Sequence, residues 1–297
     1  MKKWFNYFIY ISIIFLIVFL VRADYFVVPV VRNVFHLVLA FVFVFIGFFL
    51  DAYSWYKALH LFNCKQVKYL DCVASEGLSI FGKYIPGKIW VILGRSAYIS
   101  KRYDLNEKEV ASISLNVQFV SLWSALLLGI LGLAFIQVSW YIVLGSIALL
   151  IIFSLILFTP LFHRLFTVIM MKLLRKRFDI PQLTISSVLF VLPFSVLCWL
   201  TWCLGFWFLA ISLVPEHIPL FAGLFYALGA SLGMIAIILP GGLGMREGLL
   251  SLTLIAAGLA SDFSVTVSVS SRLWYLIGEG FIFFTGLIIS RFYKLRK

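Results

Sequence analysis

The stretch VFHLVLAFVFVFIGFFL, residues Val34–Leu50, contains no Lys, Arg, Asp or Glu over 17 positions. A second uncharged stretch of the same length runs from Phe5 to Val21. A helix rises 1.5 Å per residue, so about 20 apolar residues cross the hydrocarbon core of a bilayer. Both stretches therefore predict transmembrane helices.

The composition agrees with a membrane location for the whole chain. Of the 297 residues, 63% are hydrophobic and only 12% are charged, and the mean hydropathy is +1.09. Soluble domains are about 45–50% apolar and about 25% charged. We expect an all-α polytopic membrane protein with a single integral membrane domain over residues 1–297 and about six full transmembrane helices.

The net charge of +12 is explained by membrane topology rather than by a nucleic-acid partner. Cytoplasmic loops are enriched in Lys and Arg, and the basic stretches alternate along the chain as this rule requires. We therefore expect both termini to be cytoplasmic and the protein to lie in the cytoplasmic (inner) membrane. The basic stretches hold 17 of the 24 Lys and Arg residues and are Lys2–Lys3, Lys57–Lys68, Lys101–Lys108, Arg164–Arg177 and Arg291–Lys297.

Metal and cofactor chemistry is not expected. The four cysteines form no CxxC pair and the four histidines are scattered, which argues against a metal site or a disulfide framework. The nucleotide-binding pattern G-x-x-x-x-G-K-[ST] is absent from the sequence. We expect no cofactor and no enzymatic activity.

Two apolar segments are interrupted by Pro-Gly. Val73–Ser100 has 28 residues, too few for two crossings, and is expected to be re-entrant. Leu220–Ala260 has 41 residues and allows either a re-entrant segment or two tilted spans. The basic stretch Lys57–Cys72 is expected to lie along the membrane interface. Full spans are expected at Trp4–Val21, Val34–Tyr56, Glu107–Ile136, Trp140–Phe162, Leu183–Val214 and Val265–Ser290.

The order of these segments repeats. Each half of the chain, 1–137 and 138–297, has two spans, a Pro-Gly-broken segment and one span. The halves would start on opposite sides of the membrane, so the repeat would be inverted. Inverted repeats with broken helices that meet near the midplane are a recurrent transporter architecture.

Charged side chains inside these apolar segments predict the functional site. Each costs at least about 2.5–3.5 kcal/mol on insertion scales. A helix that restarts after a Pro-Gly break presents free N–H groups and a positive dipole end, which favour an anion. We expect an anionic lipid headgroup to bind there, with Glu76 as a further counter-ion. The candidate residues are Lys83, Pro86, Gly87, Lys88, Arg95, Pro240, Gly241, Gly242, Gly244, Arg246, Glu247, Arg272 and Glu279.

Other interpretations of these residues remain open. Arg246–Glu247 and Arg272–Glu279 could be structural ion pairs that fix helix packing. Asp51 is expected near the interface. Gly229 and Gly233 are expected to allow close helix packing. The cluster Trp199, Trp202 and Trp207 is expected to serve as an interfacial belt or in packing.

Two motifs carry a resemblance to a known family. They are GKYIPGKIW at Gly82–Trp90 and LPGGLGMREG at Leu239–Gly248. The chain resembles the flippase-like family named for the transmembrane region of lysylphosphatidylglycerol synthases, over essentially its whole length. Many members carry an acidic residue soon after the first Pro-Gly, where this chain has Trp90. The carried-over positions are Pro86, Gly87, Pro240, Gly241, Gly242, Gly244, Arg246 and Glu247.

The resemblance implies movement of lipids or lipid-linked molecules between leaflets. We expect a lipid flippase-like transporter for a phosphate-bearing lipid, with a polyprenyl-phosphate-linked glycan as one cargo class and glycan or lipid synthesis enzymes as partners. One alternative is a membrane-embedded glycosyltransferase, for which the acids on the external side are Asp24, Glu216 and Asp262. Another alternative is a non-transporting scaffold subunit of a glycan or lipid synthesis complex.

Overall fold

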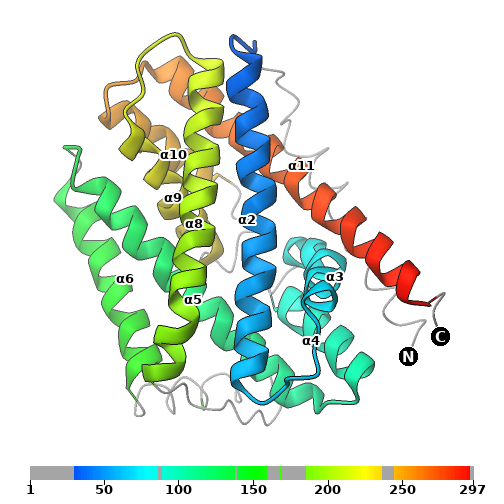
Figure 1. Cartoon of the computed structure of the whole chain (residues 1–297). Coiled ribbons are helices and arrows are strands. Elements are labelled where there is room, and N and C mark those ends of the chain that lie inside the picture. Colours follow the sequence, from blue (N-terminus) through cyan, green and yellow to red (C-terminus); the bar gives the residue numbers. More distant parts are fainter. Residues whose placement is uncertain are drawn as a thin grey trace.

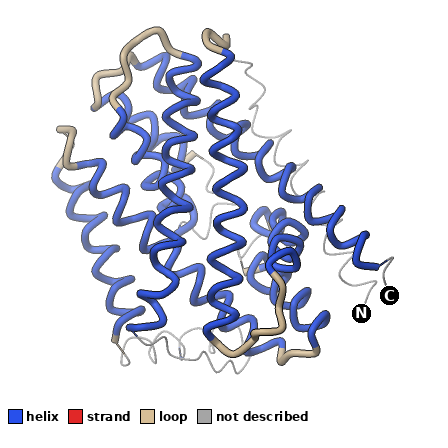
Figure 2. Tube along the Cα trace, in the orientation of Figure 1, coloured by secondary structure: helices blue, strands red, loops and turns tan. Residues whose placement is uncertain are grey.

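All regular secondary structure in the described part of the chain is helical (Figure 2). The structure is a computed structural model that describes residues 30–85, 89–137, 139–159, 168, 185–235 and 244–294. Within these described residues, four helices are long and apolar enough to cross a membrane (Figure 1). These helices are α2 (Val34–Leu61), α5 (Glu107–Leu133), α8 (Ile185–Leu213) and α11 (Ser261–Lys294).

The other helices are shorter. They are α3 (Tyr69–Ser79), η1 (Ile80–Tyr84), α4 (Trp90–Tyr103), α6 (Trp140–Phe158), η2 (Leu220–Leu224), α9 (Phe225–Ile235) and α10 (Met245–Ala256). The all-α membrane architecture is thus as expected. The expected span Trp4–Val21 lies outside the described residues, so the total of six spans stays a prediction.

Local sequence signals explain where several helices begin. The Asn33 side chain accepts a hydrogen bond from the His36 N–H at 3.1 Å and caps α2. Asn106 caps α5 in the same way through the Lys108 N–H at 3.1 Å. Gly244 precedes α10 with a φ of +76°, a conformation that favours glycine. The Gly244 N–H donates to the Glu247 carboxylate at 2.9 Å, which closes the first turn.

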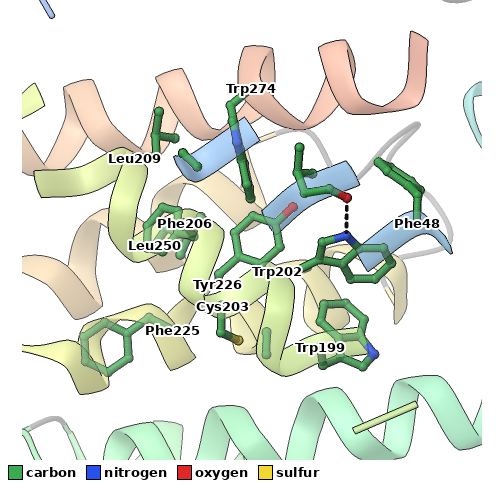
Figure 3. Packing of buried hydrophobic residues seen from close by; sticks show 14 of the residues in the cluster. Phe48, Trp199, Trp202, Cys203, Phe206, Leu209, Phe225, Tyr226, Leu250 and Trp274 are labelled. Carbon is green, nitrogen blue, oxygen red and sulfur yellow. Dashed lines mark hydrogen bonds between the residues drawn. The ribbon is translucent and has the colours of Figure 1, made fainter. Parts of the chain in front are cut away.

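The centre of the bundle is an antiparallel pair of helices, α2 and α8 (Figure 1). The start of α2 meets the end of α8, because the Arg32 N–H donates to the Ser212 carbonyl at 2.9 Å. Farther along, the Trp202 indole N–H donates to the Val44 carbonyl at 3.3 Å, the contact drawn in Figure 3. A Cβ at Gly47 would lie 2.2 Å from the same indole. Glycine on α2 therefore lets a tryptophan of α8 lie against the helix backbone.

Aromatic side chains fill the core around this pair. Figure 3 shows Trp199 and Trp202 beside Phe48, with Tyr226 and Trp274 nearby. The rings of Trp199 and Trp202 meet edge to face at 5.0 Å between centroids. The Trp199 N–H donates to the Ser121 hydroxyl at 3.0 Å. Trp199 and Trp202 thus serve in packing, one of the two roles expected for this cluster.

The first broken segment forms a hairpin, which we call the first hairpin (Tyr69–Tyr103). Helix α3 packs against α4, and the Arg102 Nε lies 2.6 Å from the Asp71 carboxylate, which joins the start of α3 to the end of α4. At 1.5 Å per residue, α3 is about 17 Å long and α4 about 21 Å, each shorter than the hydrocarbon core of about 30 Å.

The expected interfacial stretch Lys57–Cys72 is not a separate element. Helix α2 continues to Leu61, a turn follows, and α3 begins at Tyr69. Val67 and Cys72 pack into the bundle, with 2% and 0% of their surface exposed, and the expected position of the stretch along the membrane interface stays a prediction.

The second broken segment resembles the first in its contacts. Helices α9 and α10 pack together, and a Cβ at Gly229 would lie 2.9 Å from the Leu250 side chain and 3.2 Å from the Arg246 carbonyl. This confirms the packing role expected for Gly229. We call η2, α9 and α10 together the second helix pair (Leu220–Ala256).

Each short pair packs on a long helix that is distant in the sequence. Helix α3 crosses α11 so closely that a Cβ at Gly77 would lie 2.2 Å from the Ile282 carbonyl oxygen. Helix α9 crosses α5 in the same manner, with a Cβ at Gly129 2.8 Å from the Leu228 Cα. The division into repeat halves 1–137 and 138–297 stays a prediction.

Candidate functional site

One buried ion pair lies within the first hairpin, and its arginine also joins the hairpin to α5. The Arg95 guanidinium donates to the Glu76 carboxylate at 3.1 Å, and the two side chains are 2% and 3% exposed. The remaining Arg95 donors reach Ser114, its hydroxyl at 2.5 Å and its carbonyl at 2.7 Å. The guanidinium carbon lies 4.8 Å from the Trp55 ring centroid. All three nitrogens of Arg95 therefore have protein partners, as a structural ion pair requires.

A second polar group connects the first hairpin to α11. The Lys83 ammonium and the Tyr84 hydroxyl both contact the Glu279 carboxylate, the hydroxyl at 2.8 Å. Glu279 is 1% exposed. Both donors lie in η1, so their contacts with Glu279 hold this part of the first hairpin against α11.

Arg246 brings a second cation to this region from α10. Its guanidinium carbon lies 4.7 Å from the Tyr226 ring centroid and 5.4 Å from that of Tyr275. Lys83 shares the Tyr275 ring, with its ammonium 4.8 Å from the centroid. Arg246 is 5% exposed, and its Nε and Nη2 have no hydrogen-bond partner among the described residues.

Arg272 adds the third cation from α11. Its guanidinium carbon lies 5.6 Å from the Tyr84 ring centroid, and the side chain is 5% exposed. The charges of Arg246 and Arg272 both act on Lys83. We call Lys83, Arg246, Arg272 and Glu279 the cationic cluster. Three cations and one carboxylate leave it with a net positive charge.

This arrangement suits an anion. Burying a charge is unfavourable unless it is paired and hydrogen-bonded. Aromatic faces compensate a cation by only about 0.5–2 kcal/mol. A guanidinium presents a planar fork of donors that matches the oxygens of a phosphate or carboxylate. Arg246 therefore has both the charge and the unpartnered donors to bind such a group.

A family model matches most of the chain. The model for the lysylphosphatidylglycerol synthase TM region matches residues 7–279. This chain belongs to that family. Searches of curated proteins and of solved structures find no match.

Membership in the lysylphosphatidylglycerol synthase TM region family confirms the resemblance carried by the two motifs. It establishes a multi-pass membrane protein related to lipid synthesis or transport. The matched residues include every member of the cationic cluster and end at Glu279 itself. The site therefore lies within the part of the chain that defines the family.

The structure brings some of the expected site residues together and separates others. Lys83, Arg246, Arg272 and Glu279 meet in the cationic cluster, whereas Arg95 pairs with Glu76. Among the described residues Arg246 forms no ion pair, and Glu247 instead caps α10 through Gly244. The candidates that lie outside the described residues are Pro86, Gly87, Lys88, Pro240, Gly241 and Gly242.

Tyrosines are the site residues that sequence reasoning missed. Tyr84, Tyr226 and Tyr275 provide the ring faces on which the three cations lie. One signal was present, because Arg272, Tyr275 and Glu279 are spaced by three and four residues and so share a face of α11.

Asp51 is partly buried within α2, ten residues before that helix ends at Leu61. Its expected position near the interface stays a prediction.

The acids considered for sugar transfer have structural surroundings where they are described. Glu216 accepts a hydrogen bond from the Ala260 N–H at 3.4 Å. Asp262 lies in the first turn of α11, where the helix dipole stabilises a negative charge. Asp24 lies outside the described residues. Within the described part of the chain, no three His, Cys, Asp or Glu side chains are grouped as a metal site.

Proposed function

We propose that this protein is a lipid flippase-like transporter that holds the phosphate of a lipid headgroup in the cationic cluster. The observation that carries the proposal is Arg246, a 5% exposed cation with two unpartnered donor nitrogens beside two further cations. A phosphate supplies the negative charge and the acceptor oxygens that this environment favours.

The cluster joins parts of the chain that transport requires to move. Lys83 belongs to the first hairpin, Arg246 to the second helix pair, and Arg272 and Glu279 to α11. We propose that both short pairs are re-entrant and meet near the midplane, so that the headgroup lies between them while the lipid tails stay in the bilayer. Broken helices that form a substrate site near the midplane, at the interface between repeats, are found in secondary transporters.

Glu279 would compete with the substrate. Its carboxylate contacts the Lys83 ammonium and accepts a hydrogen bond from the Tyr84 hydroxyl. A phosphate that binds Lys83 would break its contact with Glu279 and so release the first hairpin from α11. Substrate binding would thereby change how the first hairpin packs on α11. Alternating access would then follow from relative movement of the repeat halves.

Orientation, cargo and partners form part of the same proposal. The basic loops favour cytoplasmic termini and a location in the cytoplasmic membrane. The cargo class is a phosphate-bearing lipid, either a phospholipid or a polyprenyl-phosphate-linked glycan, and enzymes that make such lipids are the expected partners. The role is transport rather than catalysis.

Reconstituted vesicles test the proposal. Fluorescent phosphatidylglycerol, phosphatidylcholine and a polyprenyl phosphate are each followed by the fraction of label accessible to a membrane-impermeant quencher. Flipping of one phosphate-bearing lipid with a net negative headgroup is expected, and Arg246→Gln should reduce its rate at least about tenfold, a loss of about 1.4 kcal/mol.

The matched control is Arg291→Gln, which removes an exposed cation from the last turns of α11. It should flip lipid at the wild-type rate. An Arg246→Gln protein that also does so would contradict the headgroup site, and a wild-type protein that moves none of the three lipids would contradict the transport function.

A further inference from the structure

A groove on the outer surface of the bundle has no part in the cationic cluster. It lies between α2 and the start of α3, with a volume of about 590 Å³. Its apolar part is formed by Ile46, Phe49 and Leu50. Because α2 is long and apolar enough to span a membrane, we expect lipids to surround this groove.

The length of the groove matches one leaflet. Its lining on α2 runs from Ile46 to Lys57, a separation of 11 residues and therefore about 17 Å along the helix. One leaflet contributes about 15 Å of a hydrocarbon core of about 30 Å. A chain that starts at the level of Lys57 and follows α2 would end near the midplane. That depth suits a diacyl phospholipid, whereas a polyprenyl chain is longer than one leaflet.

The other end of the groove is cationic and aromatic. The Lys57 ammonium lies 5.1 Å from the Tyr53 ring centroid and 5.8 Å from that of Phe194. Lys57 forms no ion pair with any carboxylate of the described residues. The rings of Tyr53, Tyr56 and Tyr69 pack edge to face or tilted at 5.7–6.0 Å. Tyrosine and lysine at the level of lipid headgroups anchor membrane proteins to the interface.

The walls of this end are fixed rather than loose. The Tyr69 hydroxyl donates to the Phe49 carbonyl at 2.9 Å and ties α3 to α2 along the groove. The Lys57 ammonium makes this end of the groove positive, which suits an anionic headgroup.

We infer that this groove is a binding site for an anionic diacyl phospholipid. Its phosphate lies at Lys57, and one acyl chain follows α2 past Leu50 to Ile46. The site is separate from the cationic cluster, so it stands whether or not the protein transports lipid.

Native mass spectrometry of the delipidated protein in detergent tests the inference. Phosphatidylglycerol, phosphatidylcholine and a polyprenyl phosphate are titrated in turn, and the apparent Kd of the first bound lipid is compared. Phosphatidylglycerol should bind most tightly. Lys57→Gln should weaken it about fivefold, the effect of about 1 kcal/mol for one lysine at an anionic surface. Lys65→Gln, which removes a nearby exposed cation outside the groove, should leave the Kd unchanged.

A second variant tests the acyl-chain part. Leu50→Trp fills the apolar floor and should weaken phosphatidylglycerol and phosphatidylcholine alike, because both carry the same chains. Equal Kd values for these two lipids in the wild-type protein would indicate unspecific annular lipid and overturn the inference. So would an equal effect of Lys57→Gln and Lys65→Gln, or tighter binding of the polyprenyl phosphate. Repeated on the Arg246→Gln protein, in which the cationic cluster no longer binds the phosphate, the titrations should give the same effects of Lys57→Gln and Leu50→Trp, which separates this groove from the proposed transport site.

Discussion

Two of the three buried arginines of the predicted site, Arg95 and Arg246, should respond in opposite ways to removal of their charge. Arg95 is fully paired with Glu76 and Ser114, whereas Arg246 forms no ion pair among the described residues. Arg95→Met keeps an apolar side chain of similar length and deletes the guanidinium. Glu76, 3% exposed, would then remain buried without its cation.

The magnitude follows from this burial. Removing one partner of a buried ion pair destabilises a protein by about 3–5 kcal/mol, because the other charge is left uncompensated. The contact of Arg95 with the Trp55 ring, at 4.8 Å, adds about 0.5–2 kcal/mol to that range at most. Replacing both members, in Arg95→Met with Glu76→Met, should restore most of the lost stability, since apolar replacement of a whole buried pair is often neutral.

Equilibrium unfolding in mixed detergent micelles, followed by tryptophan fluorescence, measures these free energies. A double-mutant cycle on Arg95 and Glu76 should give a coupling of about 3 kcal/mol. Arg246→Met, the matched control, should unfold within about 1 kcal/mol of wild type, because no carboxylate among the described residues loses its partner. Binding of anionic lipid to the cationic cluster should instead be weaker in Arg246→Met than in the wild-type protein. An Arg95→Met protein of wild-type stability, or an Arg246→Met protein destabilised as strongly as Arg95→Met, would refute this distinction.

Three further predictions concern the cluster, the helix crossing and a thiol. Glu279→Gln removes the charge that pairs with Lys83 and should tighten binding of anionic lipid to the cationic cluster by about fivefold to tenfold, or about 1–1.4 kcal/mol. A Kd equal to that of the wild-type protein in native mass spectrometry would rule out competition by the carboxylate. Gly77→Ala places a Cβ 2.2 Å from a carbonyl oxygen of α11 and should lower the unfolding free energy by about 1–3 kcal/mol. Gly280→Ala, with nothing within 4 Å, should instead raise it by about 0.5–1 kcal/mol, and a loss in both variants would contradict the crossing geometry. Burial raises the pKa of the Cys64 thiol, so less of the reactive thiolate is present at neutral pH. Maleimide labelling of the native protein should therefore be slow at neutral pH and become faster as the pH rises above the ordinary pKa of a thiol. Labelling as fast as in the unfolded chain would show that the thiol is exposed.

The sequence determined the class of this protein because its signals are local. Runs such as Val34–Leu50 need no partner to be recognised as spans, since transfer into lipid depends on the hydrophobicity of each residue. The helix starts at Asn33 and Asn106 follow from capping groups within three residues. The Pro-Gly breaks likewise marked the two segments that form short helix pairs.

Which charges meet was decided by the tertiary structure alone. Lys83 and Glu279 lie 196 residues apart, and no periodicity connects them. Arg95 and Lys83 are both cations of the first hairpin, yet one pairs within the hairpin and the other joins the cationic cluster. An ion pair depends on the positions of two side chains in space, and these are fixed by the close crossing of α3 with α11 at Gly77. Hydrophobicity places a helix in the membrane, but only packing between distant helices determines whether a buried cation finds a carboxylate or is left with donors for a ligand.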